Sequence, residues 1–479
     1  MKVQENLIRF VLNPLGRLME KLPGKLKTAL FYFGGAVLFF LYFFNASTYR
    51  FSRYLVVFAG GCLAVGIMVL STMPGSFRRI KPDRLLSNCW FAAGAFMLIS
   101  GILYNSDNFS DAIMFLVVYP LVWYVWCQKP ISEIFRLLSR LCIHSFEVFL
   151  LVSAMFFPIH QAQYPGLMNN VNEAAAYLSL VFAVLMVELL ETPGYTLRYW
   201  GNLALSGVAT TLVFYTNSRT GQLACIVVFV VVTGLHLYNN RPCWGKIVLR
   251  RVLPVAISFL IFLPTTVYGL QGIRWVEQKA TQTITKWIQV EDPDFPEENT
   301  SEPEENTSEP EENTSEDDPQ THGVQGFFEK NEEKTSSDGK NLDQISTGRL
   351  EIWRVFAGHV RLFGTDEEVR FFVPSRNDYY VTSHNTPLEF AVYSGVFCGI
   401  LYFLFNLLAG LKAMGYAVKQ TKENGYKLLP IAVTMAFGVC SMLGSLKTPF
   451  TYMITVYYFF VQAPLVFSVK SEQQAENAK

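Results

Sequence analysis

The sequence predicts an all-α integral membrane protein with about twelve transmembrane helices and a large outward-facing loop between helices 9 and 10. Two observations support this fold class. Hydrophobic residues make up 51% of the 479 residues and charged residues only 16%, whereas soluble domains carry about 25% charged residues. Apolar runs also recur along the chain at close to the ~20 residues that a helix needs to cross about 30 Å of hydrocarbon.

The predicted spans form two groups on either side of one long hydrophilic insertion. Helices 1–9 lie within residues 29–270 and helices 10–12 within 386–468. In chain order the expected spans are 29–45, 52–70, 86–104, 112–127, 138–157, 172–190, 200–215, 221–238, 248–270, 386–411, 428–446 and 450–468.

Lys and Arg residues predict the orientation, because basic residues near the ends of spans stay in the cytoplasm. They gather in every second loop between predicted spans. The other loops contain few basic residues, namely Arg50, Arg53, Arg219 and Lys447. The pattern predicts a cytoplasmic N-terminal segment at 1–28, a cytoplasmic tail at 469–479 and an extracytoplasmic loop at 271–385. The basic segment 1–28 lacks the cleavage pattern of a secretory signal, so we expect no cleavable leader.

The loop contains an acidic tract. Residues 271–383 hold 25 acidic and 11 basic residues, and the rest of the chain holds 14 and 28. Residues 296–316 are three identical copies of PEENTSE, and 291–318 contain no basic residue. Such a tract buries too little apolar surface to fold, so we predict disorder. Calcium binding is the alternative, but the glycine turn of a calcium loop is missing. The basic residues elsewhere form no continuous stripe, which argues against nucleic-acid binding.

Beyond the tract, residues 346–364 have the spacing of an amphipathic helix. The apolar positions recur every three or four residues: Leu350, Trp353, Phe356, Val360 and Phe363. Ser346 and Thr347 offer capping hydroxyls at its start. Tethered between two spans, this helix is expected to lie along the outer membrane surface.

Three residues predicted at the outer membrane surface have the chemistry of a diphosphate-dependent site. Arg219 lies in a short turn between two spans, Arg349 begins the amphipathic helix, and His384 precedes a span. Two guanidinium groups suit a diphosphate because each binds phosphate oxygens bidentately and stays charged. A histidine suits general base catalysis on a hydroxyl. Taken singly, each has a structural explanation as a snorkelling arginine, a cap-adjacent arginine or an interfacial histidine.

These residues lie in motifs that resemble the O-antigen ligase and O-antigen polymerase superfamily. The motifs are the Ser218-Arg219-Thr220 turn, the segment TGRLEIW at 347–353, and His384-Asn385 before a span. The segment NNVNE at 169–173, which includes Asn172, resembles an asparagine-containing segment of the same family. The layout of spans and the position of the long loop are also similar. One departure is the turn LFGTD at 362–366, which lacks the usual second glycine.

The resemblance implies a metal-independent membrane glycosyltransferase in surface polysaccharide biosynthesis. It would transfer a glycan from a polyprenyl (undecaprenyl) diphosphate carrier to a glycan or lipid-linked acceptor, such as lipopolysaccharide core. The enzyme would be a multi-pass protein of the bacterial cytoplasmic (inner) membrane, with its active site facing the periplasm or exterior. By resemblance, Arg219 and Arg349 would bind the diphosphate and His384 would activate the acceptor hydroxyl. Asn385 would orient His384, with Ser218 and Asn172 in support, while Tyr380 is a candidate for stacking on a sugar ring.

No cofactor is expected. A lipid diphosphate is already an activated leaving group, and the arginines supply the positive charge that would stabilise it. The chain accordingly shows no nucleotide-binding loop and no paired metal-ligand histidines. Its eight cysteines lie in or beside predicted spans, which gives no disulfide framework.

Several alternatives stay open at this point. The sequence does not separate a ligase from a polymerase, because both use the same donor. A lipid-linked oligosaccharide flippase or other polysaccharide transporter is the second function, although the basic pair lies at one membrane face rather than along the spans. A structural or sensory protein with an acidic tether is the third. His144 and Glu147 share one face of a predicted span, which fits either a proton relay or an interhelical polar contact.

Overall fold

The protein is described here by a computed structural model, and the residues that it describes are 80% helix and 3% strand, which makes the fold all-α. The fold class predicted from the sequence is therefore confirmed. The structure describes residues 2–47, 54–104, 108–157, 163–192, 194–266, 279, 349–365, 371–373, 378–418, 426–447 and 450–469. The predicted acidic tract at 291–318 and most of the predicted loop at 271–385 lie outside these residues.

The helices before the long loop are α1 (Lys2–Glu20), α2 (Gly24–Ser47), α3 (Tyr54–Ser71), α4 (Arg84–Tyr104), α5 (Asn108–Ile113), α6 (Tyr119–Trp126), α7 (Ile131–Phe156), α8 (Val171–Glu191), α9 (Leu197–Tyr215), α10 (Arg219–Asn239) and α11 (Trp244–Ile247). η2 (Arg241–Cys243) is a short 3-10 turn, whereas η1 (Met114–Val118) and η3 (Val248–Val252) are π-helical segments within the longer helices Asn108–Trp126 and Trp244–Thr266. The helices after it are α15 (Arg349–Ala357), α16 (Thr386–Tyr393), α17 (Val396–Val418), α18 (Leu429–Met442), α19 (Met453–Val461) and α20 (Ala463–Val466).

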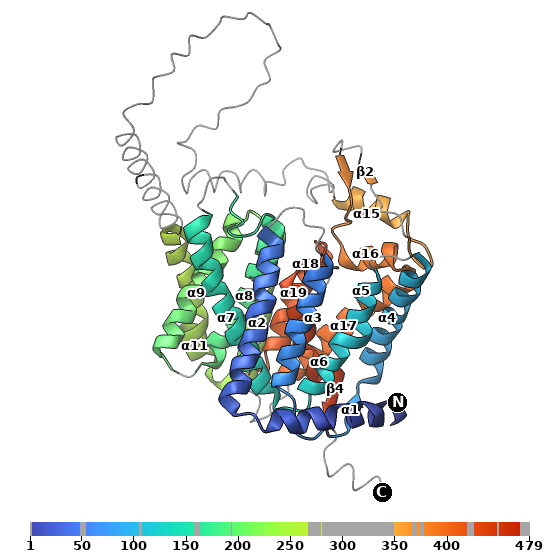
Figure 1. Ribbon diagram of the computed structural model, residues 1–479. Helices are drawn as coiled ribbons and strands as arrows, with labels where there is room; N and C mark the ends of the chain where they lie inside the picture. Colours follow the sequence, from blue (N-terminus) through green and yellow to red (C-terminus); the bar gives the residue numbers. More distant parts are fainter. Residues whose placement is uncertain are drawn as a thin grey trace, which may run out of the picture.

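The strands form two short antiparallel pairs. β1 (Ile80–Pro82) pairs with β4 (Phe467–Val469), and β2 (Phe371–Val373) pairs with β3 (Asp378–Tyr380). Both α1 and β4 lie at the bottom of the bundle in Figure 1, whereas α15 and β2 lie at the top. We call these the terminal end and the loop end of the bundle.

Eight helices in the described part of the chain are long and apolar enough to cross a membrane. Two shorter apolar helices, Val56–Ser71 and Leu429–Met442, accompany them. α9 occupies the position of a predicted span but is not among the eight. The total of about twelve spans stays a prediction.

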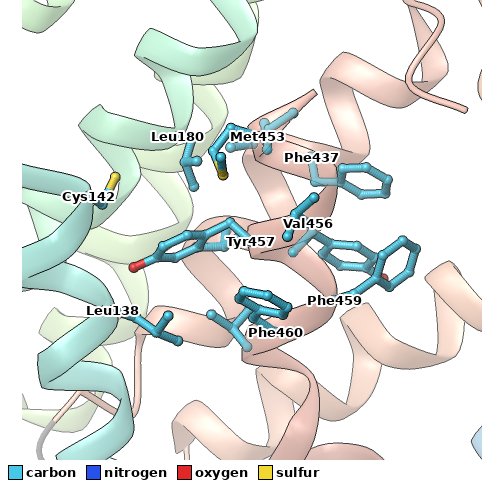
Figure 2. Packing of buried hydrophobic residues seen from close by; sticks show 14 of the residues in the cluster. Leu138, Cys142, Leu180, Phe437, Met453, Val456, Tyr457, Phe459 and Phe460 are labelled. Atoms are coloured by element: carbon cyan, nitrogen blue, oxygen red, sulfur yellow. The ribbon is translucent and has the colours of Figure 1, made fainter. Parts of the chain in front are cut away.

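α8 forms the centre of the bundle. Every residue from Ala174 to Leu190 is buried, because α7, α9, α10, α18 and α19 all pack around it. α19 lies in the same core, with every residue from Met453 to Val461 buried. Figure 2 shows Tyr457 pointing toward Leu138 and Cys142 of α7, while Phe459 points to the other side of α19.

The predicted span 450–468 is not one continuous helix. α19 ends at Val461, α20 runs from Ala463 to Val466, and the chain then becomes β4. Pro464 explains the break, since proline has no N–H to donate and its ring clashes with the preceding turn. The carboxamide of Gln462, buried at the break, donates a hydrogen bond from Nε2 to Thr434 Oγ1 (3.1 Å).

The predicted span 386–411 is also divided. α16 ends at Tyr393, and the membrane-length helix α17 begins at Val396. Gly395 between them has φ +99°, a conformation that side chains other than glycine rarely adopt. A Cβ there would lie 2.3 Å from the carbonyl oxygen of Leu362, so the segment after α15 crosses directly over this break. α16 is thereby separated from the span and packs against α15.

The predicted amphipathic helix 346–364 is observed as the shorter α15. Its residues Ile352 and Phe356 are buried against Val392 of α16. Gly358 and His359 follow the helix in a hydrogen-bonded turn, and residues 346–348 lie outside the described residues. The packed face therefore differs from the predicted one, because Ile352 is buried while Leu350 is exposed.

Candidate active site

Arg219 is the first residue of α10. α9 ends at Tyr215, and Asn217 turns the chain with φ +54°, a conformation that asparagine tolerates better than most residues. Ser218 and Thr220 on either side of Arg219 are buried, and Arg219 itself is half-buried. The turn therefore fixes the backbone of Arg219 at the loop end of the bundle.

Arg349 lies against the same turn. Both of its terminal nitrogens lie 3.3 Å from Thr220 Oγ1, so the guanidinium group donates to this hydroxyl. The contact joins the first residue of α15 to the residue that follows Arg219. The structure thus brings together the two segments that carry the predicted diphosphate-binding arginines.

His384 faces a cavity of about 150 Å³. This cavity lies between the start of α8, the start of α10, the residues before α16 and the connection from α18 to α19. Its wall is formed by Asn170, Asn172, Glu173, Ala176, Thr220, Gly221, Thr382, His384, Cys440, Leu443, Gly444, Ser445, Leu446 and Tyr452. Thr220 both lines the cavity and accepts from Arg349, so the arginine segments and His384 meet at one cavity, which we call the His384 cavity.

The backbone of His384 is held in an unusual conformation, with φ +52°. The residues on both sides hold it there. Ser383 Oγ donates to the carbonyl oxygen of Asn385 (2.9 Å) and accepts from its N–H (3.1 Å). A left-handed residue at a site wall is a feature that clusters at functional positions.

Asn385 positions His384 through the backbone. Its Oδ1 accepts from the N–H of Leu388 (3.1 Å) and caps α16, and its Nδ2 donates to the carbonyl oxygen of Met442 (3.1 Å). The side chain therefore fixes the start of α16 against the end of α18.

Asn172 and Ser218 contact each other. Ser218 Oγ donates to Asn172 Oδ1 (2.9 Å), which ties the first turn of α8 to the turn before α10. Asn170 caps α8 by accepting from the N–H of Asn172 (2.8 Å). Both supporting residues predicted from the sequence therefore lie at the His384 cavity or its rim.

Tyr380 lies at the end of β3, with its ring centre 6.2 Å from that of His384 in an edge arrangement. It also packs against the cluster of Ile352, Phe356 and Val392. This contact connects His384 to α15. Sugar stacking by Tyr380 stays a prediction.

Two carboxylates near the site were missed by the sequence reasoning. Glu173 lines the His384 cavity, and its buried Oε1 has no hydrogen-bond partner within the described residues. Glu389 of α16 accepts from the N–H of Ser383 (3.1 Å) and from Ser445 Oγ (2.6 Å), and so supports the His384 segment from behind. Their positions in the sequence were the available signal. Glu173 ends the asparagine-containing segment 169–173, and Glu389 lies three positions after the first residue of α16.

Lys447 anchors the connection between α18 and α19. Its Nζ donates to Asn108 Oδ1 (2.7 Å) and lies 3.6 Å from a carboxylate oxygen of Asp111. Asn108 Nδ2 in turn donates to the carbonyl oxygen of Tyr393 at the end of α16 (2.8 Å). This buried network fixes two walls of the cavity relative to each other.

The family comparison covers this region. Residues 203–403 match the family model of O-antigen ligase. Over these residues the chain is similar to O-antigen ligases. This confirms the predicted superfamily. The matched region runs from α9 into α17 and contains Arg219, Arg349 and His384, while Asn172 lies before it. A search of curated proteins found no match.

The similarity to O-antigen ligases indicates a ligase- or polymerase-type membrane glycosyltransferase in general terms. Within the described residues, no group of three or more His, Cys, Asp or Glu side chains is arranged to hold a metal ion. Metal independence stays a prediction.

Proposed function

We propose that this protein transfers a glycan from a polyprenyl (undecaprenyl) diphosphate carrier to an acceptor hydroxyl on the outer face of the cytoplasmic membrane. The observation that carries this proposal is the contact of Arg349 with Thr220, next to Arg219 and at the wall of the His384 cavity. It joins two cations and a histidine drawn from distant segments. A lipid-linked diphosphate donor needs this combination of groups.

In this proposal the arginines bind the leaving group. The bond between the anomeric carbon and the diphosphate oxygen breaks, and negative charge gathers on that oxygen. Arg219 and Arg349 neutralise it, and the positive end of α10, where Arg219 lies, adds to their effect. A fixed cationic site of this kind lowers the barrier because it needs no reorganisation as charge develops.

His384 accepts the proton of the acceptor hydroxyl as its oxygen bonds to the anomeric carbon. Attack from the face opposite the diphosphate would invert the anomeric centre. Glu173 lines the same cavity, and its buried Oε1 has no hydrogen-bond partner in the described part of the chain. It is therefore placed to accept a hydrogen bond from a sugar hydroxyl, since buried polar atoms need partners.

The expected orientation puts the loop end on the periplasmic or exterior side and both termini in the cytoplasm. The distribution of Lys and Arg between alternate connections supports this orientation. In the same proposal, residues 271–385 form the extracytoplasmic loop and residues 291–318 a disordered insertion.

The test uses purified full-length protein in nanodiscs with polyprenyl diphosphate-linked repeat units from the host, with and without its candidate terminal acceptor. A ladder from repeat units alone identifies a polymerase, and transfer that requires the terminal acceptor identifies a ligase. Absence of both products with folded protein and intact substrates contradicts the proposal.

Two substitutions test the diphosphate site in this assay. Arg219→Lys and Arg349→Lys each keep the charge but lose the bidentate guanidinium group, so kcat/KM should fall about 100-fold. Arg354→Lys is the matched control, because Arg354 is exposed on the same helix as Arg349. Unchanged kcat/KM in the first two variants would remove the arginines from the site.

A further inference from the structure

A second polar region lies on the opposite half of the bundle. A groove of about 600 Å³ runs between α2, α7 and α9. It is lined by Tyr32, Arg140, Ile143, His144, Glu147, Arg198, Gly201, Asn202 and Leu205. Its volume is within the range of about 300–1,000 Å³ typical of small-molecule sites. We call it the α7–α9 groove.

The groove starts near the terminal end and reaches toward the middle of the bundle. Arg198 is the second residue of α9, and Leu205 lies about 10 Å further along that helix. Arg140 and Glu147 lie about 14 Å and 24 Å from the start of α7, a helix about 39 Å long. The groove is therefore about as long as one leaflet is thick, and too short to receive a complete spanning helix.

His144 and Glu147 occupy a costly position. Their side chains are 62% and 49% exposed in the body of a membrane-length helix, where ionisable groups facing hydrocarbon are unfavourable. His144 Nδ1 and Glu147 Oε2 lie 2.9 Å apart, so the two groups satisfy each other. The ring of Tyr32 lies beside them, 6.5 Å from that of His144. A polar ligand in the groove would explain their position.

The two arginines of the groove differ in their partners. Arg198 is paired with Glu188 of α8 (2.7 Å). Glu147 is paired with His144. Arg140 has no carboxylate within 4 Å in the part of the chain that the structure describes. Asn202, 95% buried, likewise has no hydrogen-bond acceptor there for its Nδ2. The groove thus presents the guanidinium group of Arg140, with an amide donor buried in its wall.

We propose that the α7–α9 groove binds an anionic phospholipid from the leaflet at the terminal end. The phosphate lies at Arg140 and Arg198, since guanidinium groups bind phosphate oxygens well. One acyl chain lies along Ile143, Gly201 and Leu205. The phosphate gives Arg140, which has no carboxylate within 4 Å among the described residues, an anionic partner.

The phospholipid proposed for the α7–α9 groove is a different molecule from the lipid-linked glycan donor of the proposed function. The His384 cavity lies at the loop end, whereas the groove opens toward the opposite membrane surface. Lipid bound here is a resident of the protein rather than a substrate. The proposal is therefore tested without any measurement of glycan transfer.

Gly201 offers a clean way to block the groove. A Cβ at this position meets no atom within 4 Å, so a larger side chain extends into open space. Gly415, on α17, has the same property and is exposed. Gly201→Leu fills the groove, and Gly415→Leu is its matched control. Arg140→Gln removes a positive charge from the groove, and Arg79→Gln removes an exposed arginine that does not line the groove.

The experiment is native mass spectrometry of the full-length protein released from nanodiscs of equimolar phosphatidylglycerol and phosphatidylethanolamine. The wild type should retain phosphatidylglycerol preferentially. Gly201→Leu and Arg140→Gln should each lower its retention about tenfold, and both controls should match the wild type. Thermal unfolding confirms that each variant is folded.

Three outcomes would overturn the proposal. Equal retention of the two lipids would exclude charge recognition. Wild-type retention by folded Gly201→Leu would place the lipid elsewhere. A dimer that dissociates only in Gly201→Leu would assign the groove to a second copy of the chain.

Discussion

The His384 cavity and the α7–α9 groove both carry ionisable side chains in an otherwise apolar bundle, but they are built differently. The cavity uses residues at helix ends, such as Asn172, Thr220 and His384, and hydrogen bonds to backbone or neighbouring side chains fix them. The groove uses residues from the sides of three helices, with apolar walls between them. Capped helix ends hold polar groups rigidly, which suits chemistry, whereas a long half-apolar groove suits a lipid.

The largest effect that this difference predicts is at His384. His384→Asn keeps a residue that tolerates φ +52° but removes the imidazole. Transfer should fall about 1,000-fold, because general base catalysis contributes on that order. Turnover of repeat units measures it, and phospholipid retention in the groove should not change.

His359→Asn is the control for this variant, since His359 is exposed in the turn after α15. It should transfer glycan at the wild-type rate. Turnover by His384→Asn within tenfold of the wild type would mean that the cavity and the groove do not differ in catalytic role.

A smaller effect is expected at Glu173. Glu173→Gln has nearly the same shape but loses a carboxylate oxygen that has no partner among the described residues. KM for the glycan substrate should rise about tenfold, because a hydrogen bond between a sugar hydroxyl and this carboxyl group is lost. The melting temperature should rise slightly, since burial of a carboxyl group costs more than burial of an amide. An unchanged KM together with a raised melting temperature would show that Glu173 does not contact substrate.

The smallest effect is expected from the acidic repeats. Deletion of residues 296–316 should change transfer and lipid retention less than about twofold, because the sequence predicts that these acidic repeats form no packed core, and such an insertion would contribute little to either site. The same two assays measure this. A folded deletion variant without activity would show that the repeats take part in the reaction.

Composition and the recurring apolar runs were enough to predict the fold class. The contact of Arg349 with Thr220 joins segments far apart in the chain, so no local periodicity predicts it; the sequence indicated only that both segments lie at the outer membrane surface, and the resemblance assigned them to one site. The breaks at Gly395 and before Pro464 were missed, because apolar runs were treated as continuous spans while backbone conformation ended the helices.

The acidic residues of the site were missed for another reason. Glu173 is the last residue of the asparagine-containing segment, at the start of a span. A carboxylate there can face water at little energetic cost, so the sequence alone suggests no role for it. In the folded chain α10 and the segment before α16 cover this helix end and bury its Oε1. Burial of this kind depends on segments more than forty residues away, so local sequence does not show it.

The burial of α8 has a consequence for how the protein is assembled. Four of the helices that surround it, α9, α10, α18 and α19, are synthesised after it, so α8 first enters the bilayer with much of its surface facing lipid. Its one deeply buried acid, Glu188, is followed only ten residues later by its partner Arg198. The charge is therefore neutralised as soon as α9 begins to form, before the rest of the shell closes around the helix.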